Sequence, residues 1–218
     1  MDGQRLCWGA WDWRHASWQG RYYPDDLPQD WRLAYYANDF ACLGVPLDAW
    51  YPDAVAGAQV LREAAVAGFR CVVEAPPGLE AAGPAREALR ALADGLGEHL
   101  AAVLVPVEHT HGPARRAALD WAGTLAPALA AAPVDGLPGV WRPEAPCEAV
   151  GAVLVARVPI AALPDLATVR GVVEQVLAAA GERPAVLLVE EAPAAAGQAP
   201  ATERLRELGI IAQLLGVT

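Results

Sequence analysis

Six short and almost purely apolar runs, separated by longer segments with helical spacing, constrain the fold of this chain most strongly. The runs cover residues 6–10, 42–47, 69–75, 102–107, 152–158 and 185–189. They lack the polar alternation of half-exposed strands, which is typical of parallel strands buried on both faces. Alternation of such strands with helices predicts βαβ units with right-handed crossovers. We therefore expect an α/β fold built on a parallel sheet.

The segments between these runs place apolar residues three or four positions apart, on one face of a helix. The clearest examples lie within residues 89–100, 121–129 and 166–176. Weaker versions follow Pro28 and Pro52. Helical segments thus alternate with the apolar runs along the chain.

The intervals between strand starts predict the number of strands. Starts at residues 102 and 152 are far enough apart for two βα units, so a further strand is expected within residues 134–141, where Gly and Pro obscure the pattern. The tail, residues 210–217, can supply another. Seven to eight parallel strands predict a TIM-barrel-like (β/α) barrel, which must be shortened because such barrels usually need about 250 residues. No linker divides the chain, so residues 1–218 are expected to form a single domain.

Composition limits the partners and the compartment. Hydrophobic residues make up 55% of the chain and charged residues 19%, which supplies a large core and excludes a disordered chain. The net charge is −10 and there is no Lys, which argues against nucleic acid or an anionic membrane as a partner. No secretory signal and no long apolar segment are recognisable, so a cytoplasmic protein is expected.

The cysteines point to the same compartment. Cys7, Cys42, Cys71 and Cys147 form no C-x-x-C pair and have no metal-ligand spacing, and three of them lie in apolar runs. We interpret these thiols as small core residues in a reducing environment.

The first forty residues carry a family resemblance. Residues 11–13 (Trp-Asp-Trp) and 18–24 (Trp-Gln-Gly-Arg-Tyr-Tyr-Pro) resemble the opening signature of the DUF72, or YecE-like, family: Trp-x-Tyr, then Trp-x-Gly-x-Phe-Tyr-Pro. Residues 31–37 with Phe40 are similar to the family's Leu-x-Tyr-Tyr-Ala-x-x-Phe, and residues 68–70 resemble its Gly-Phe-x-Phe strand. The resemblance implies a TIM-barrel-like fold and no established activity.

The chain departs from this family's pattern at the ends of the strands. Gly44 and Pro46 stand where the family has Glu and Asn, Glu74 replaces a Lys, and Pro106 replaces a Gln. Of the family's Arg-Leu-His-Gly only Arg157 remains, with Pro159 and Ile160 in place of the last two, and Glu190 and Glu191 replace an Asn pair. Polar side chains at strand ends are the ones a ligand meets in a barrel, so the resemblance implies a divergent member with altered or lost site chemistry.

The strand ends also supply the candidate catalytic and metal-binding residues. Glu74, Glu108 and Arg157 are the candidate catalytic residues, because carboxylates from different strands can form an acid/base pair. His109 and His111 would point the same way on an extended segment and could bind a divalent metal. They could equally be solvated loop residues, and the sequence predicts no other cofactor. A serine nucleophile is disfavoured, since the only Ser, Ser17, lacks a nucleophile-elbow pattern.

A second set of residues is predicted to bind a ligand at the same end of the barrel. It comprises Trp11, Asp12, Trp13, Trp18, Asp48, Arg157 and Glu190. The aromatic rings could stack a sugar, or could pack the first loop against the barrel. Arg157, inside an apolar strand, needs either an anionic ligand or a buried ion pair with Glu74 or Glu190.

Two functions remain open from the sequence. One is a non-catalytic or altered-site protein that binds a small molecule or a protein partner, which Gly44, Pro46, Pro106 and Pro159 favour because they cannot perform acid/base or metal chemistry. The other is a hydrolase- or lyase-type enzyme acting on a small polar substrate, sugar- or phosphate-like, in the mouth of the barrel.

Overall fold

A computed structural model describes residues 5–106, 112–131, 140–141, 153–191 and 201–217 of the chain. Eight strands pair in the order β5-β4-β3-β2-β1-β8-β7-β6, and every pair is parallel. The strands are β1 (Leu6–Trp11), β2 (Cys42–Val45), β3 (Arg70–Glu74), β4 (Leu100–Pro106), β5 (Ala128–Ala131), β6 (Val140–Trp141), β7 (Leu154–Pro159) and β8 (Ala185–Glu190).

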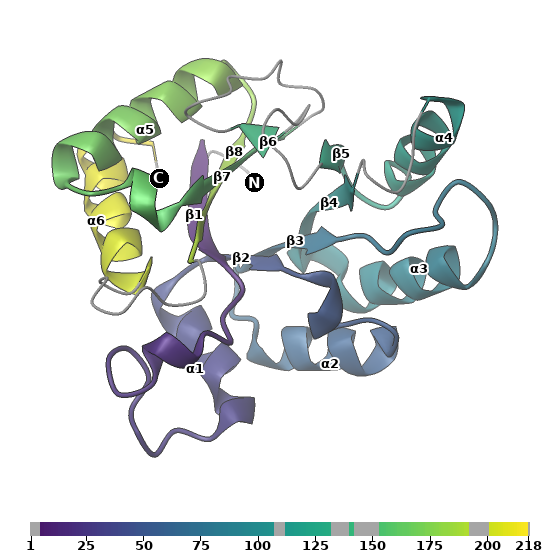
Figure 1. Cartoon of the computed structure of the whole chain (residues 1–218), viewed down its shortest axis with the longest axis horizontal. Helices are drawn as coiled ribbons and strands as arrows, with labels where there is room; N and C mark the ends of the chain where they lie inside the picture. The colour runs from purple at the N-terminus through teal and green to yellow at the C-terminus, as the bar shows by residue number, and fades with distance from the viewer. Residues whose placement is uncertain (1–4, 107–111, 132–139, 142–152, 192–200, 218) are drawn as a thin grey trace.

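In the described part of the chain, six α-helices surround this sheet (Figure 1). They are α1 (Arg32–Asp39), α2 (Ala54–Ala64), α3 (Pro84–Leu96), α4 (Gly112–Ala122), α5 (Leu166–Ala180) and α6 (Ala201–Leu214). Short 3-10 turns cover Ala16–Trp18, Gln29–Trp31, Leu47–Ala49, Gly97–His99 and Ile160–Ala162. Asp53 and Asp165 cap α2 and α5 by accepting hydrogen bonds from backbone N–H groups in the first turn, which is the expected role of Asp at a helix start.

The sheet is curled and its two faces have different neighbours. Side chains on the outer face pack against the helices and together form the larger hydrophobic cluster, which includes Leu89 of α3 and Val173 of α5. The inner face forms a smaller cluster of strand residues such as Cys7, Val72 and Leu188. Because side chains alternate along a strand, the residues two positions further on, at the carboxyl ends, also face inward.

The α/β class and the parallel, TIM-barrel-like arrangement are confirmed, but a complete barrel is not formed in the described part of the chain. Six central strands, from β4 through to β7, make a continuous curled sheet, and the short strands β5 and β6 extend it at either edge. Figure 1 shows these two edges facing each other at the top of the sheet, and no ladder joins them among the described residues. The curl is therefore that of an open barrel.

Two local expectations were wrong. The tail proposed as an extra strand is helical as far as Leu214, because Leu205, Leu208 and Ala212 follow helical spacing and bury against the sheet. The helix expected within residues 121–129 ends at Ala122, and the chain then enters β5. In both places a short apolar run fits the two-residue period of a strand as well as the 3.6-residue period of a helix. Periodicity alone therefore does not distinguish strand from helix.

The aromatic first segment packs around Trp18, which has no exposed surface. Its ring contacts those of Tyr22, Tyr23 and Tyr36. The Tyr36 hydroxyl accepts a hydrogen bond from the Ala10 N–H at 2.7 Å and donates one to the Cys42 carbonyl at 2.7 Å, so it links β1 to β2 from the helical side. These contacts fix the loop after β1 against the sheet, where the candidate site lies.

Candidate functional site at the carboxyl ends of the strands

We define the mouth as the carboxyl-terminal end of the inner sheet face, formed by Trp11, Gly44, Glu74, Arg157 and Glu190. Alternation along β1, β2, β3, β7 and β8 points these five positions inward. The parallel register sets Trp11 opposite Gly44 on one side and opposite Glu190 on the other. The mouth thus joins residues that are far apart in the sequence.

One face of the Trp11 ring covers Gly44. A Cβ added at residue 44 would lie 2.2 Å from Cε3 of Trp11, which is closer than any real contact. The indole therefore occupies the space in which a side chain at residue 44 would stand. Glycine at residue 44 is therefore required for the Trp11 ring to pack in this position.

Trp11 also supports Arg157. The Arg157 guanidinium carbon lies 3.8 Å from the centroid of the indole, and its Nη2 is ion-paired with Oε1 of Glu190. Arg157 and Glu190 side chains are only 17% and 19% exposed, so the cation–π contact and the ion pair are both largely desolvated. Of the two ion-pair partners expected for Arg157, the structure places Glu190 there.

Arg157 retains one unused donor. Its Nε is buried and has no hydrogen-bond partner among the described residues. A buried donor without a partner carries a desolvation cost of about 1–3 kcal/mol. An oxygen atom of a bound molecule would remove that cost.

Glu74 lies at the end of β3 and is fixed by the turn that follows β2. Its Oε2 accepts a hydrogen bond from the Leu47 N–H at 3.1 Å, and its backbone carbonyl accepts one from Trp50 Nε1 at 3.1 Å. One carboxylate oxygen of Glu74 is therefore used to hold the β2 turn. The carboxylate is half-buried and faces the mouth.

Asp12 and Asp48 are joined at the rim by Arg14. The Arg14 guanidinium binds Asp12 through two hydrogen bonds, of 2.9 and 2.8 Å, and Asp48 through one of 2.8 Å. Asp12 has a left-handed backbone with φ of 70°, and its Oδ1 accepts from the Trp13 and Arg14 N–H groups. Burial raises the pKa of Asp12, but the hydrogen bonds and charge of Arg14 lower it more, so the net pKa lies below the ordinary value. Asp12 is a charged acceptor, not a proton donor.

Glu191 ties three segments together just beyond β8. Its carboxylate accepts hydrogen bonds from the Ser17 hydroxyl, from Trp18 Nε1 at 2.7 Å and from the Ala201 N–H at the start of α6 at 3.0 Å. Burial raises the pKa of Glu191, but these hydrogen bonds lower it more, and the net pKa is below its usual range. Glu191 therefore holds the loop after β1 against β8 and α6.

The predicted aromatic platform is mostly internal packing. Trp18 is fully buried and Trp13 is 7% exposed, so neither presents a free ring face in this structure. Trp11 is half-buried, and its faces contact Gly44 and Arg157. Only part of the Trp11 edge remains for a ligand.

Three predicted residues, Glu108, His109 and His111, lie outside the described residues, so the metal prediction and part of the catalytic one stay predictions. Within the described ranges no three His, Cys, Asp or Glu side chains gather as a metal site requires. Within the same ranges no helix is both long and apolar enough to cross a membrane.

The comparisons with known proteins decide the family. The family model described as "Protein of unknown function DUF72" matches residues 7–134, more than half of the chain. The chain belongs to the DUF72 family. No curated protein matches it.

Solved structures of the family share the fold of this DUF72 protein. A DUF72 family protein of Thermotoga maritima is 14% identical with a TM-score of 0.60, over 94% of this chain and 98% of that chain. A DUF72 family protein of Enterococcus faecalis is also 14% identical with a TM-score of 0.61, over 99% of both chains. At such identities the likeness concerns the fold alone.

Sequence reasoning missed the residues that organise this site. Arg14, Ser17 and His15 were not predicted, yet Arg14 joins two predicted carboxylates and Ser17 binds Glu191, which was not among the candidate site residues either. His15 Nε2 lies 3.1 Å from the Trp11 carbonyl oxygen, and the His15 ring contacts that of Trp18. The available signal was the Asp-x-Arg spacing directly after a buried strand, which favours a local carboxylate–guanidinium pair.

Proposed function

We propose that this DUF72 protein binds a small polyhydroxylated molecule, sugar-like in chemistry, at the mouth and does not transform it. The proposal rests on the Nε of Arg157. This nitrogen is buried and donates no hydrogen bond to any described residue, although Trp11 and Glu190 hold the guanidinium in place. A buried donor left without an acceptor favours a ligand oxygen that reaches it. Because Nε is buried, the side chains that cover it must shift to admit that oxygen.

The charges around the mouth favour a neutral ligand over an anion. Four carboxylates, those of Asp12, Asp48, Glu74 and Glu190, stand against the guanidiniums of Arg14 and Arg157. Hydroxyl groups can donate to carboxylates and accept from Arg157, whereas a phosphate would meet an excess of like charge. The part of the Trp11 ring that stays exposed adds apolar contact for the C–H groups of a sugar.

The same contacts argue against acid/base catalysis by the described residues. Glu190 is neutralised by Arg157, Asp12 by Arg14, and one oxygen of Glu74 is bound to Leu47. A general acid near neutral pH needs a raised pKa, and the pKa values of Asp12 and Glu191 are lowered. The carboxylates serve the architecture of the mouth.

The experiment is a titration calorimetry screen with monosaccharides and polyols on the parent chain, Arg157→Lys and Arg170→Lys. Lys keeps the charge but removes Nε and the planar stacking on Trp11. Arg170 forms an exposed ion pair with Glu174 on α5 and serves as the matched control. We expect saturable binding by the parent, about tenfold weaker binding by Arg157→Lys, and no change in Arg170→Lys.

Two calorimetric results would contradict the proposal. One is the absence of heat with every sugar and polyol, and the other is an equal affinity of Arg157→Lys and the parent. Chromatography of the incubated sugars tests the enzyme alternative: products that disappear in Glu74→Gln would establish a hydrolase or lyase instead.

A further inference from the structure

A groove on the outer wall of the sheet lies between α3 and α4, outside the mouth. α2 and α3 pack directly against each other, whereas α3 and α4 stand apart at the right of Figure 1. The cavity between them has a volume of about 420 Å³, and its lining includes Gly83, Arg86, Arg90, Asp94 and Trp121. This size is within the range of small-molecule sites.

Two guanidinium groups converge on the floor of this groove. Arg86 and Arg90 are four residues apart on α3, so they project from the same face. Their guanidinium carbons lie 4.9 and 5.7 Å from the centroid of the Trp121 ring. Like charges at this spacing repel, and neither arginine forms an ion pair among the described residues.

The arginines are partly preorganised. Arg86 Nε donates to the Leu79 carbonyl at 2.9 Å, which orients the guanidinium and leaves its two Nη groups for another acceptor. The Trp121 ring is half-buried and shields one side of both guanidiniums from water. Two planar donor groups held against one ring have the geometry that binds the oxygens of a phosphate or a carboxylate.

We propose that the groove between α3 and α4 binds a small oxyanion, with Arg86 and Arg90 as its ligands and Trp121 as the surface that holds them. The chemistry shared by a phosphate group and a carboxylate defines the ligand. Glu87 and Asp94 also line the groove, so a compact anion that reaches the guanidiniums is favoured over an extended polyanion. Binding of an anion here relieves the repulsion between the two cations.

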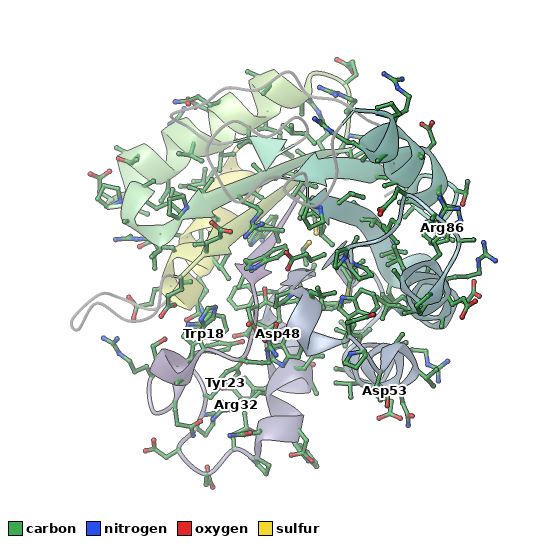
Figure 2. All side chains as sticks on the ribbon, turned by 45° about the vertical axis from the view of Figure 1, so that its right-hand side comes forward. Trp18, Tyr23, Arg32, Asp48, Asp53 and Arg86 are labelled. Carbon is green, nitrogen blue, oxygen red and sulfur yellow. The ribbon has the colours of Figure 1, made fainter. Side chains whose placement is uncertain are left out.

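This site is distinct from the mouth. Figure 2 shows Arg86 on the helical side of the molecule, far from Asp48 and Trp18, which lie near the loop after β1. The charge also differs: the mouth has more carboxylates than guanidiniums, whereas the groove lining has two of each, and its two arginines form no ion pair among the described residues. Failure of one proposal therefore leaves the other standing.

The test is titration calorimetry at constant ionic strength with inorganic phosphate and, separately, with malonate. The variants are Arg86→Gln/Arg90→Gln and Arg90→Lys. The control is Arg62→Gln, which removes a positive charge at an exposed position on α2. We expect saturable binding of at least one anion by the parent chain and a loss of about tenfold or more in affinity for each arginine removed. Arg62→Gln and Arg157→Lys should bind as the parent does, and Arg90→Lys should bind with intermediate affinity.

The two anions distinguish the ligand class, since stronger phosphate binding indicates a phosphorylated molecule and stronger malonate binding a carboxylate. Circular dichroism melting of each variant shows whether it is folded, and Arg90→Lys keeps the test valid if the double variant is not. No saturable heat with either anion would overturn the proposal, and so would equal affinity in Arg86→Gln/Arg90→Gln, or an equal loss in Arg62→Gln.

Discussion

Trp11 and Gly44 lie opposite each other in the register of β1 and β2, and the indole of Trp11 fills the volume above the glycine. The two residues act as one unit, because any side chain at residue 44 would displace the Trp11 ring. Arg157 rests on the same ring, so the unit also sets where the guanidinium stands. The glycine at residue 44 and the arginine over Trp11 are thus linked features of one site.

Gly44→Ala should destabilise the chain. The added methyl would meet the Trp11 ring, and overpacking of this kind typically costs about 1–3 kcal/mol. Gly171→Ala is the matched control, because its Cβ would enter open space in the middle of α5 and should stabilise by about 0.5–1 kcal/mol. Urea unfolding of both variants measures the difference, and equal effects would refute the close contact.

Tyr36→Phe should cost about 1–3 kcal/mol of unfolding free energy. The variant removes a hydroxyl that pairs with both Ala10 and Cys42 and leaves their buried backbone groups without a partner. Tyr35→Phe is the control, since Tyr35 is 36% exposed. Chemical denaturation tests this, and a Tyr36→Phe chain as stable as the parent would show that the strands pair without the hydroxyl.

Glu191→Gln should make the stability of the folded chain depend less on pH under acidic conditions. The folded-state pKa of Glu191 is lowered, so its contribution is present above the unfolded pKa, about 4.3, and is lost as pH falls through the folded value. The parent should therefore lose more stability than the variant between pH 6 and about pH 3. Melting temperatures at a series of pH values measure this, and parallel profiles would contradict the role of Glu191.

Three thiols should be unreactive in the folded chain. Cys7, Cys42 and Cys71 are buried, and burial raises the pKa of Cys71 to about 12. A hydrogen bond with Cys42 lowers the pKa of Cys7, so burial must exclude the reagent from that thiol. In a Cys147→Ser chain, a thiol reagent should modify none of them before denaturation and all three after it. Rapid labelling of the native chain would show that the inner face is open.

The strands that formed as predicted share one property: they are continuous apolar runs too short for a helix, as in residues 102–107 and 185–189. The edge strand β5 could not be predicted in this way, because its Ala-rich sequence fits a strand or a helix, and β6 occupies only the last two residues of the strand expected within residues 134–141. Residues 210–217 were predicted as strand, yet the helix α6 continues to Leu214, because a short apolar run fits a strand as well as a helix.

The candidate site was predictable in part, because strand ends could be located but contacts between strands could not. Arg157 with an acidic partner follows from a charge in an apolar run. The contact of Trp11 with Gly44 requires the register of β1 and β2, and the Asp12–Arg14–Asp48 bridge requires the left-handed turn at Asp12. The assignment of residues 1–218 to a single domain stays a prediction.

The most direct test of the account is a crystal structure of the chain with the sugar or polyol that binds best in the calorimetric screen. A hydroxyl oxygen of the ligand should lie at about 2.7–3.2 Å from Arg157 Nε, with the guanidinium still in contact with Trp11 and Glu190. A ligand bound away from the mouth, or in the mouth without a contact to Arg157 Nε, would contradict it.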